Sequence, residues 1–176
     1  NALNVYPVPD GDTGTNMHLT MQSVRRQISS ETPSTMPELA HALSYGSLLG
    51  ARGNSGVILS QILKGFAETI RKRDRLDSEA LGKALQAASD SAYAAVMKPV
   101  EGTILTVVRR TAEEVAQELP DTPLDLLRRA IVAGHEGVEE TPEMLPLLKQ
   151  AGVVDAGGLS FVDSMGLRLL VEWHRR

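Results

Sequence analysis

With 176 residues and no cysteine, the chain is long enough for one domain with a sizeable core, but it excludes disulfides and thiolate metal sites, which fits a reducing cytoplasm. Hydrophobic residues make up 42% of the sequence and aromatic residues only 3%, so aliphatic side chains must fill the core. The net charge of −4 and the lack of a basic face argue against nucleic-acid binding, and there is neither a signal peptide nor an apolar run long enough to span a bilayer.

The first informative segment is residues 4–17, where two carboxylates, Asp10 and Asp12, lead through a glycine-rich turn into a helix. Two prolines keep the approach extended, and alternate side chains of an extended segment point to the same side. Asn4 has the same parity as the two acids. Aligned carboxylates suit a hard cation such as Mg²⁺, so the motif predicts a metal–nucleotide site. The alternatives are an ordinary turn at Asp10 and a helix N-cap at Asp12 or Thr13.

The rest of the chain has apolar residues at helical spacing almost throughout. Thr122-Pro123 and Thr141-Pro142 each offer a hydroxyl N-cap followed by Pro at the first helical position. We therefore expect an all-α fold, an antiparallel up-and-down bundle or barrel of about eight helices. The expected helix starts are the end of the acidic motif, Pro37, Asn54 or Ser55, Asp77, Thr103, Thr122, Thr141 and the segment before Leu159.

A second informative segment, Gly50–Gly56, holds three glycines directly before an apolar helix. The glycines let backbone N–H groups converge on an anion at the helix N-terminus, and Asn54 and Ser55 add side-chain donors. No Walker pattern is present, so neutralising a phosphate falls to metal ions with help from Arg52. The alternative is a plain turn with a Ser or Asn cap, but we favour phosphate binding.

Two further helix-opening turns carry Thr103, after Gly102, and Asp155, before a pair of glycines. Each residue also suits an N-cap, whereas the paired glycines suggest close approach by a ligand. In an antiparallel bundle alternate helix starts lie at one end, which puts the first three turns at one pole. The fourth turn joins them only if the short helix before it does not cross the bundle.

Together, residues 4–17, 50–61, 99–106 and 154–158 resemble the nucleotide-binding domain of bacterial fatty acid kinase, which is similar to the ATP-binding L domain of dihydroxyacetone kinases. The resemblance covers essentially the whole chain and implies a helical barrel with ATP and a pair of Mg²⁺ ions at one end. It implies that Asp10 and Asp12 are catalytic metal ligands, with Asn4 in the place of a third acid. The residues that it assigns to the nucleotide or its metals are Thr15, Asn16, Gly53, Asn54, Ser55, Gly56, Thr103 and Asp155.

The resemblance also implies an activity, the transfer of phosphate from ATP to the carboxylate of a fatty acid that a separate binding protein holds. The product is an acyl phosphate for phospholipid synthesis. Residues 1–176 would be one ATP-binding domain, excised from a longer protein, lacking its first helix and not competent for full turnover alone. The alternatives are a dihydroxyacetone-type kinase subunit and a non-catalytic nucleotide-sensing module. A haloacid-dehalogenase-type phosphatase is a weaker alternative, because Pro7 and Pro9 disfavour the buried strand that it needs.

Overall fold

The computed structural model describes the backbone of residues 5–7 and 11–173, and it describes side chains within this range as far as Ser164. Over this part of the chain the structure consists of eight helices and their connections, so the predicted all-α class is confirmed. None of the described helices combines the length and apolar character that a membrane span requires. The helices are α1 (Thr13–Glu31), α2 (Met36–Gly50), α3 (Gly53–Ile70), α4 (Ser78–Ala94), α5 (Ile104–Gln117), α6 (Pro123–Met144), α7 (Pro146–Ala151) and α8 (Ala156–Trp173).

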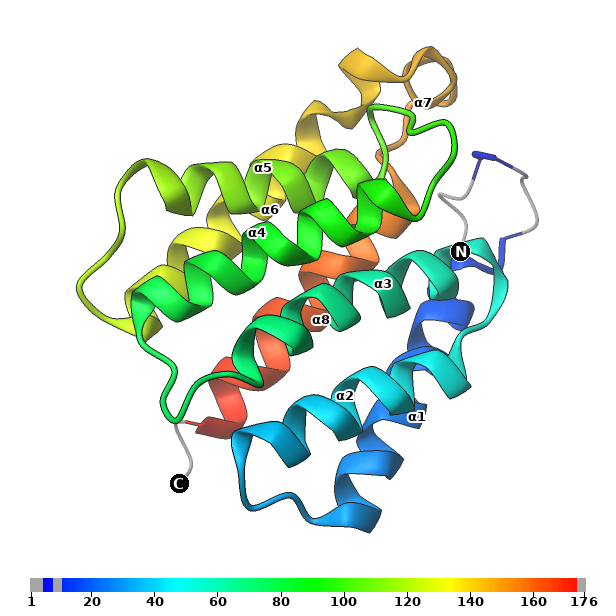
Figure 1. Cartoon of the computed structure of the whole chain (residues 1–176). Coiled ribbons are helices and arrows are strands. Elements are labelled where there is room, and N and C mark those ends of the chain that lie inside the picture. Colours follow the sequence, from blue (N-terminus) through cyan, green and yellow to red (C-terminus); the bar gives the residue numbers. More distant parts are fainter. Residues whose placement is uncertain (1–4, 8–10, 174–176) are drawn as a thin grey trace.

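The first six helices run up and down, each packed against the next in the chain. The last long helix, α8, contacts α5 and α6 on one side and α1 on the other (Figure 1). It therefore joins the two ends of the row of helices. One hydrophobic cluster takes residues from α1, α3, α4, α5, α6 and α8, so the core lies in the space that these six helices enclose.

Most long helices begin where the sequence supplies an N-cap, which satisfies backbone N–H groups that have no partner inside the helix. Thr35 and Glu38 form a capping box at the start of α2. An oxygen of Asp77 accepts a backbone N–H of the first turn of α4 at 2.8 Å. Thr103 and Thr122 cap α5 and α6 in the same way. The predicted starts of these helices are thus correct within a residue.

The predicted helix start at Thr141 is wrong, because Thr141 and Pro142 lie inside α6, which continues to Met144. Proline has no N–H, so the carbonyl of Val138 loses its normal partner four residues along the helix. The hydroxyl of Thr141 donates to this carbonyl instead, at 2.6 Å. The threonine that suggested a cap thus allows the helix to pass through the proline.

The short helix α7 begins one turn later, with Leu145 as its N-cap residue and Pro146 at its first position. It ends where predicted, at Gly152, which adopts a left-handed conformation with φ of 65°. With six residues α7 is too short to cross the bundle, so α6 and α8 are connected at one end of it.

Small residues fill much of the core, as the scarcity of aromatic residues requires. The close approach of α3 to α4 depends on Gly65, where a Cβ would collide with the carbonyl oxygen of Ala87. Many of the buried hydrophobic residues are alanines, namely Ala40, Ala42, Ala67, Ala80, Ala84, Ala88, Ala92, Ala112, Ala130, Ala133 and Ala156.

Candidate functional site

The starts of α1, α3, α5 and α8 lie at the same end of the bundle, on the right in Figure 1. The antiparallel alternation predicted this for the first three, and the shortness of α7 brings the fourth to the same end. We call this end the helix-start pole. Of the predicted site residues, Asn4 and Asp10 lie outside the described residues, so their positions stay predictions.

The closest approach at this pole is between Asn16 of α1 and Gly53 of α3. Gly53 has a φ of 58°, and a Cβ at this position would lie 2.5 Å from Nδ2 of Asn16. Only glycine tolerates both the left-handed backbone and the neighbouring amide. The end of the acidic motif at Asn16 and the glycine loop at Gly53, nearly 40 residues apart in the sequence, therefore meet in one place.

Thr20, one turn further along α1, strengthens this junction and was not identified from the sequence. Its side chain is fully buried, and its Oγ1 lies 2.8 Å from the carbonyl oxygen of Asn16 and 3.2 Å from that of Gly50. A Cβ at Gly56 would lie 2.6 Å from this hydroxyl. In the sequence, Thr20 lies in line with the apolar face of the helix. This position predicts burial in the core but not a contact with the glycine loop.

The first turn of α3 has the features of an anion-binding helix start. Its N-cap residue, Arg52, makes no side-chain cap hydrogen bond, and Arg52, Gly53 and Asn54 are exposed. The first N–H groups of a helix lack partners within it and carry partial positive charge, so they attract anions. Ser55 is half-buried and Gly56 buried behind them. An arginine and uncapped N–H groups together suit phosphate oxygens.

The acidic side of the pole is described in part. Asp12 is exposed at the N-cap position of α1, and Thr15 and Asn16 follow in the first turn, exposed and half-buried respectively. Within the described residues no three His, Cys, Asp or Glu side chains gather into a metal site. The predicted Mg²⁺ ligands include Asp10 and Asn4, which are not described, so the metal site stays a prediction.

Asp155 is a buried carboxylate that joins two of the helix starts. Its Oδ2 accepts the N–H of Gly158 at 2.7 Å, which caps α8, and the N–H groups of Gly157 and of Ile104 at the start of α5 also donate to it. Burial raises the pKa of Asp155 to about 6, although the three backbone hydrogen bonds oppose this. The capping alternative is thus correct for Asp155, and contact with a nucleotide stays a prediction.

Thr103 likewise serves the local structure. Its hydroxyl donates to the carbonyl of Val100 at 2.8 Å and accepts the N–H of Leu105 at 3.4 Å.

The paired glycines after Asp155 are explained by packing, since a Cβ at Gly158 would lie 2.6 Å from a methyl group of Val107. Close contact between α8 and α5 therefore explains the glycines without a ligand.

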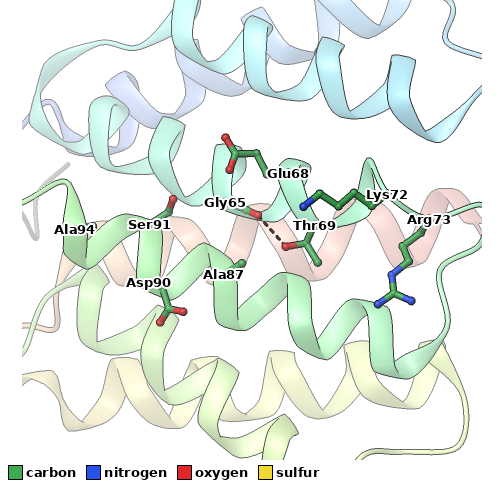
Figure 2. A pocket seen from close by; sticks show the side chains of 9 residues that line it. All are labelled: Gly65, Glu68, Thr69, Lys72, Arg73, Ala87, Asp90, Ser91 and Ala94. Carbon is green, nitrogen blue, oxygen red and sulfur yellow. Dashed lines mark hydrogen bonds between the residues drawn. The ribbon is translucent and has the colours of Figure 1, made fainter.

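A groove with a volume of 630 Å³ lies elsewhere, between the outer faces of α3 and α4. Figure 2 shows Glu68, Thr69 and Lys72 on the α3 side of it and Asp90 on the α4 side. Acidic and basic side chains are mixed along the groove, and no residue of the predicted site lines it. The groove is thus separate from the helix-start pole.

The fold and the pole define an all-α bundle that gathers helix N-termini and their anion-attracting N–H groups at one end. Residues 7–165 match the DAK2 domain, and the chain therefore belongs to the DAK2 domain family. DAK2 domains belong to kinases, so this is a domain of a kinase family.

The chain is also similar to curated proteins of Staphylococcus aureus, among them uncharacterized proteins of the strains bovine RF122 and USA300. Each is 48% identical to it over 160 residues, which is 90% of this chain and 29% of the relative. The chain thus spans less than a third of the length of the curated relatives that it matches.

Proposed function

We propose that this chain is the Mg²⁺–ATP-binding domain of a fatty acid kinase. The observation that supports the proposal is the close approach of Gly53 and Asn16, which lie at the start of α3 and at the end of the acidic motif. Membership of a kinase domain family supports nucleotide binding in general, and the resemblance of four motifs to the fatty acid kinase domain supports the narrower assignment. The proposal places the domain in the cytoplasm.

The residues at the pole fit such a ligand by their chemistry. Mg²⁺ is a hard cation that binds through oxygen atoms, and the side chains of Asp12, Asp10 and Asn4 would supply them. Mg²⁺ would neutralise phosphate charge and align the triphosphate. The N–H groups of the first turn of α3 would bind phosphate oxygens. Further polar contacts are proposed from Thr15, Asn16, Asn54 and Ser55, with Thr103 and Asp155 shaping the loops beside them.

The chain needs no general base for the proposed reaction, because a carboxylate acceptor is already ionised at neutral pH. Stabilising the charge that develops on the transferred phosphoryl group is then the main task, and it suits preorganised N–H groups and the metal ions that the carboxylates would hold. The fatty acid and the protein that presents it would meet parts of the longer protein outside this chain.

Calorimetry with Mg²⁺–ATP tests the nucleotide site. Asp12→Ala and Asn16→Ala should each weaken binding by roughly tenfold or more, because each removes a charged or polar contact to the ligand. Asp121→Ala is the matched control, since Asp121 is an exposed acid in the connection between α5 and α6, at the opposite end of the bundle. Equal affinities in all three variants and the wild type would refute the site.

The acceptor is tested separately, because a dihydroxyacetone-type kinase subunit is equally compatible with the DAK2 family. ATP consumption by the full-length protein should depend on a fatty acid together with its binding protein, and not on dihydroxyacetone. Consumption with dihydroxyacetone alone would favour the other kinase. Binding of ATP without any transfer would indicate a sensing module.

A further inference from the structure

The turn that leads into α5 at the helix-start pole is held by a relay of hydrogen bonds. Gly102 has a φ of 80°, and its N–H donates to Oγ1 of Thr106 at 2.8 Å. The hydroxyl of Thr106, which is fully buried, donates to Oε2 of Glu101 at 2.7 Å. The conformation of this turn thus depends on the position of Glu101.

Glu101 is in turn held by two side chains from different helices. Its Oε1 accepts the hydroxyl of Tyr93, near the end of α4, at 2.9 Å, and its Oε2 accepts Nη2 of Arg109, from α5, at 2.9 Å. Nε of Arg109 also donates to the Tyr93 oxygen at 3.1 Å, which closes a ring of three side chains. Glu113 accepts both its hydrogen bonds from Nη1 of Arg109, at 3.0 and 3.1 Å.

This network leaves little freedom to the groups that form it. The guanidinium donates through Nε and both terminal nitrogens, so its orientation is fixed on three sides. Burial raises the pKa of Glu101, but the hydrogen bonds from Thr106, Arg109 and Tyr93 outweigh it and hold the pKa below its usual range. Glu101 is therefore an ionised acceptor at neutral pH.

We propose that Glu101, Thr106 and Arg109 are positioning residues that set the Gly102–Thr103 turn, and thereby the start of α5, for the nucleotide at the helix-start pole. None of the three would touch the nucleotide, because they act through the backbone of the turn. The inference rests on the proposed function, since it assumes that this pole binds Mg²⁺–ATP. Glu101 and Thr106 lie within the 99–106 motif, but neither they nor Arg109 are among the residues that the resemblance assigns to the nucleotide or its metals.

The same helix offers a matched control. Arg110, the neighbour of Arg109, donates from Nη2 to both carboxylate oxygens of Glu140 at 2.7 Å. Both arginines are partly exposed and both join α5 to another part of the bundle. Only Arg109 reaches the turn, however. A general effect of losing a surface arginine should therefore be the same at both positions, whereas a positioning effect should appear at Arg109 alone.

The experiment uses the full-length protein and Mg²⁺–ATP as the probe. Arg109→Ala and Thr106→Val should each raise the dissociation constant by roughly fivefold or more, whereas Arg110→Ala and the hydroxyl-preserving Thr106→Ser should stay within about twofold of the wild type. Hydrogen exchange of the Gly102 amide should be about tenfold faster in Thr106→Val, since its acceptor is gone. Thermal unfolding shows which variants remain folded.

The outcomes separate the two proposals. If the wild type binds Mg²⁺–ATP and Arg109→Ala binds it as tightly as Arg110→Ala does, the positioning role is overturned and the nucleotide site stands. If the wild type does not bind Mg²⁺–ATP at all, both proposals fail. A loss of affinity confined to Arg109→Ala and Thr106→Val, with faster exchange at Gly102, supports the inference.

Discussion

Thr141 and Asp155 are joined by a hydrogen bond from the backbone N–H of Asp155 to Oγ1 of Thr141, at 3.0 Å. The same hydroxyl donates to the carbonyl of Val138, so one buried side chain lets α6 pass through Pro142 and anchors the start of α8. The link fixes the connection that brings α8 to the helix-start pole.

Thr141→Val should therefore destabilise the protein by about 1–3 kcal/mol, because a valine of the same shape leaves a buried donor and a buried acceptor without partners. Urea unfolding measures the change. Thr111→Val is the control, since the buried hydroxyl of Thr111 donates only to the carbonyl of Val107 in its own helix. Equal losses in both variants would contradict the special role of Thr141.

Asp155 should make the stability of the protein depend on pH. Its pKa is raised from 3.8 to about 6 in the folded chain, so folding favours the protonated form. The protonated carboxyl group therefore contributes to the free energy of unfolding. This contribution is fully present below the pKa of the unfolded chain and is lost as the pH rises through the pKa of the folded chain. Between pH 3.8 and 6 the wild type should lose about 3 kcal/mol relative to Asp155→Asn, at about 1.4 kcal/mol per pKa unit.

Urea unfolding of wild type and Asp155→Asn at pH 4 and pH 7 measures this difference directly. Other titrating groups are common to both proteins and cancel in the comparison. Parallel stability profiles over the whole range would show that the buried carboxylate has an ordinary pKa.

Gly53→Ala should reduce stability through backbone strain and should also weaken nucleotide binding. A left-handed backbone costs a residue with a Cβ about 1–2 kcal/mol, and at Gly53 the Cβ would also displace the amide of Asn16. Gly152→Ala isolates the first effect, because Gly152 has a φ of 65° but no atom within 4 Å of a Cβ. Calorimetry should show weaker Mg²⁺–ATP binding in Gly53→Ala only, and equal binding in both variants would contradict the proposed site.

Variants of Gly158 distinguish two reasons for a glycine there, which are close packing against Val107 and close approach of a ligand. Gly158→Ala should destabilise the protein by about 1–3 kcal/mol, because the new methyl group collides with Val107. In a Val107→Ala background the same change should become neutral or stabilise by up to about 1 kcal/mol, since alanine is the better helix former. A double-mutant cycle by urea unfolding measures this coupling. Additive effects, with loss of nucleotide affinity in both backgrounds, would instead indicate a ligand at the glycines.

Two Thr-Pro pairs show where prediction from the sequence succeeds and where it stops. Thr122-Pro123 begins α6 as expected, since nothing helical precedes it and the threonine caps the first turn. Thr141-Pro142 has the same local pattern but lies inside the helix, where the hydroxyl replaces the missing N–H. The same hydroxyl also accepts the N–H of Asp155, a tertiary contact that no local pattern contains.

One part of the candidate site could likewise be predicted from the sequence, and another part could not. The gathering of helix starts follows from antiparallel alternation, so the sequence predicted that residues near Asn16 and Gly53 would share a pole. The ring of Tyr93, Glu101 and Arg109 could not be predicted, because Glu101 lies eight residues from each of the other two, which are themselves sixteen residues apart on different helices. Such contacts follow neither the helical period nor a known turn, and they depend on how α4 and α5 pack.

The contacts of α8 with α1, α5 and α6 also bear on how the domain is made in the cell. The segment that joins the two ends of the bundle is synthesised after all its partners, so the enclosed core cannot be completed while the earlier helices alone have left the ribosome. Contacts between the first and last helices carry a high loop-closure cost and form late. Assembly of the helix-start pole is thus tied to the end of translation of this domain.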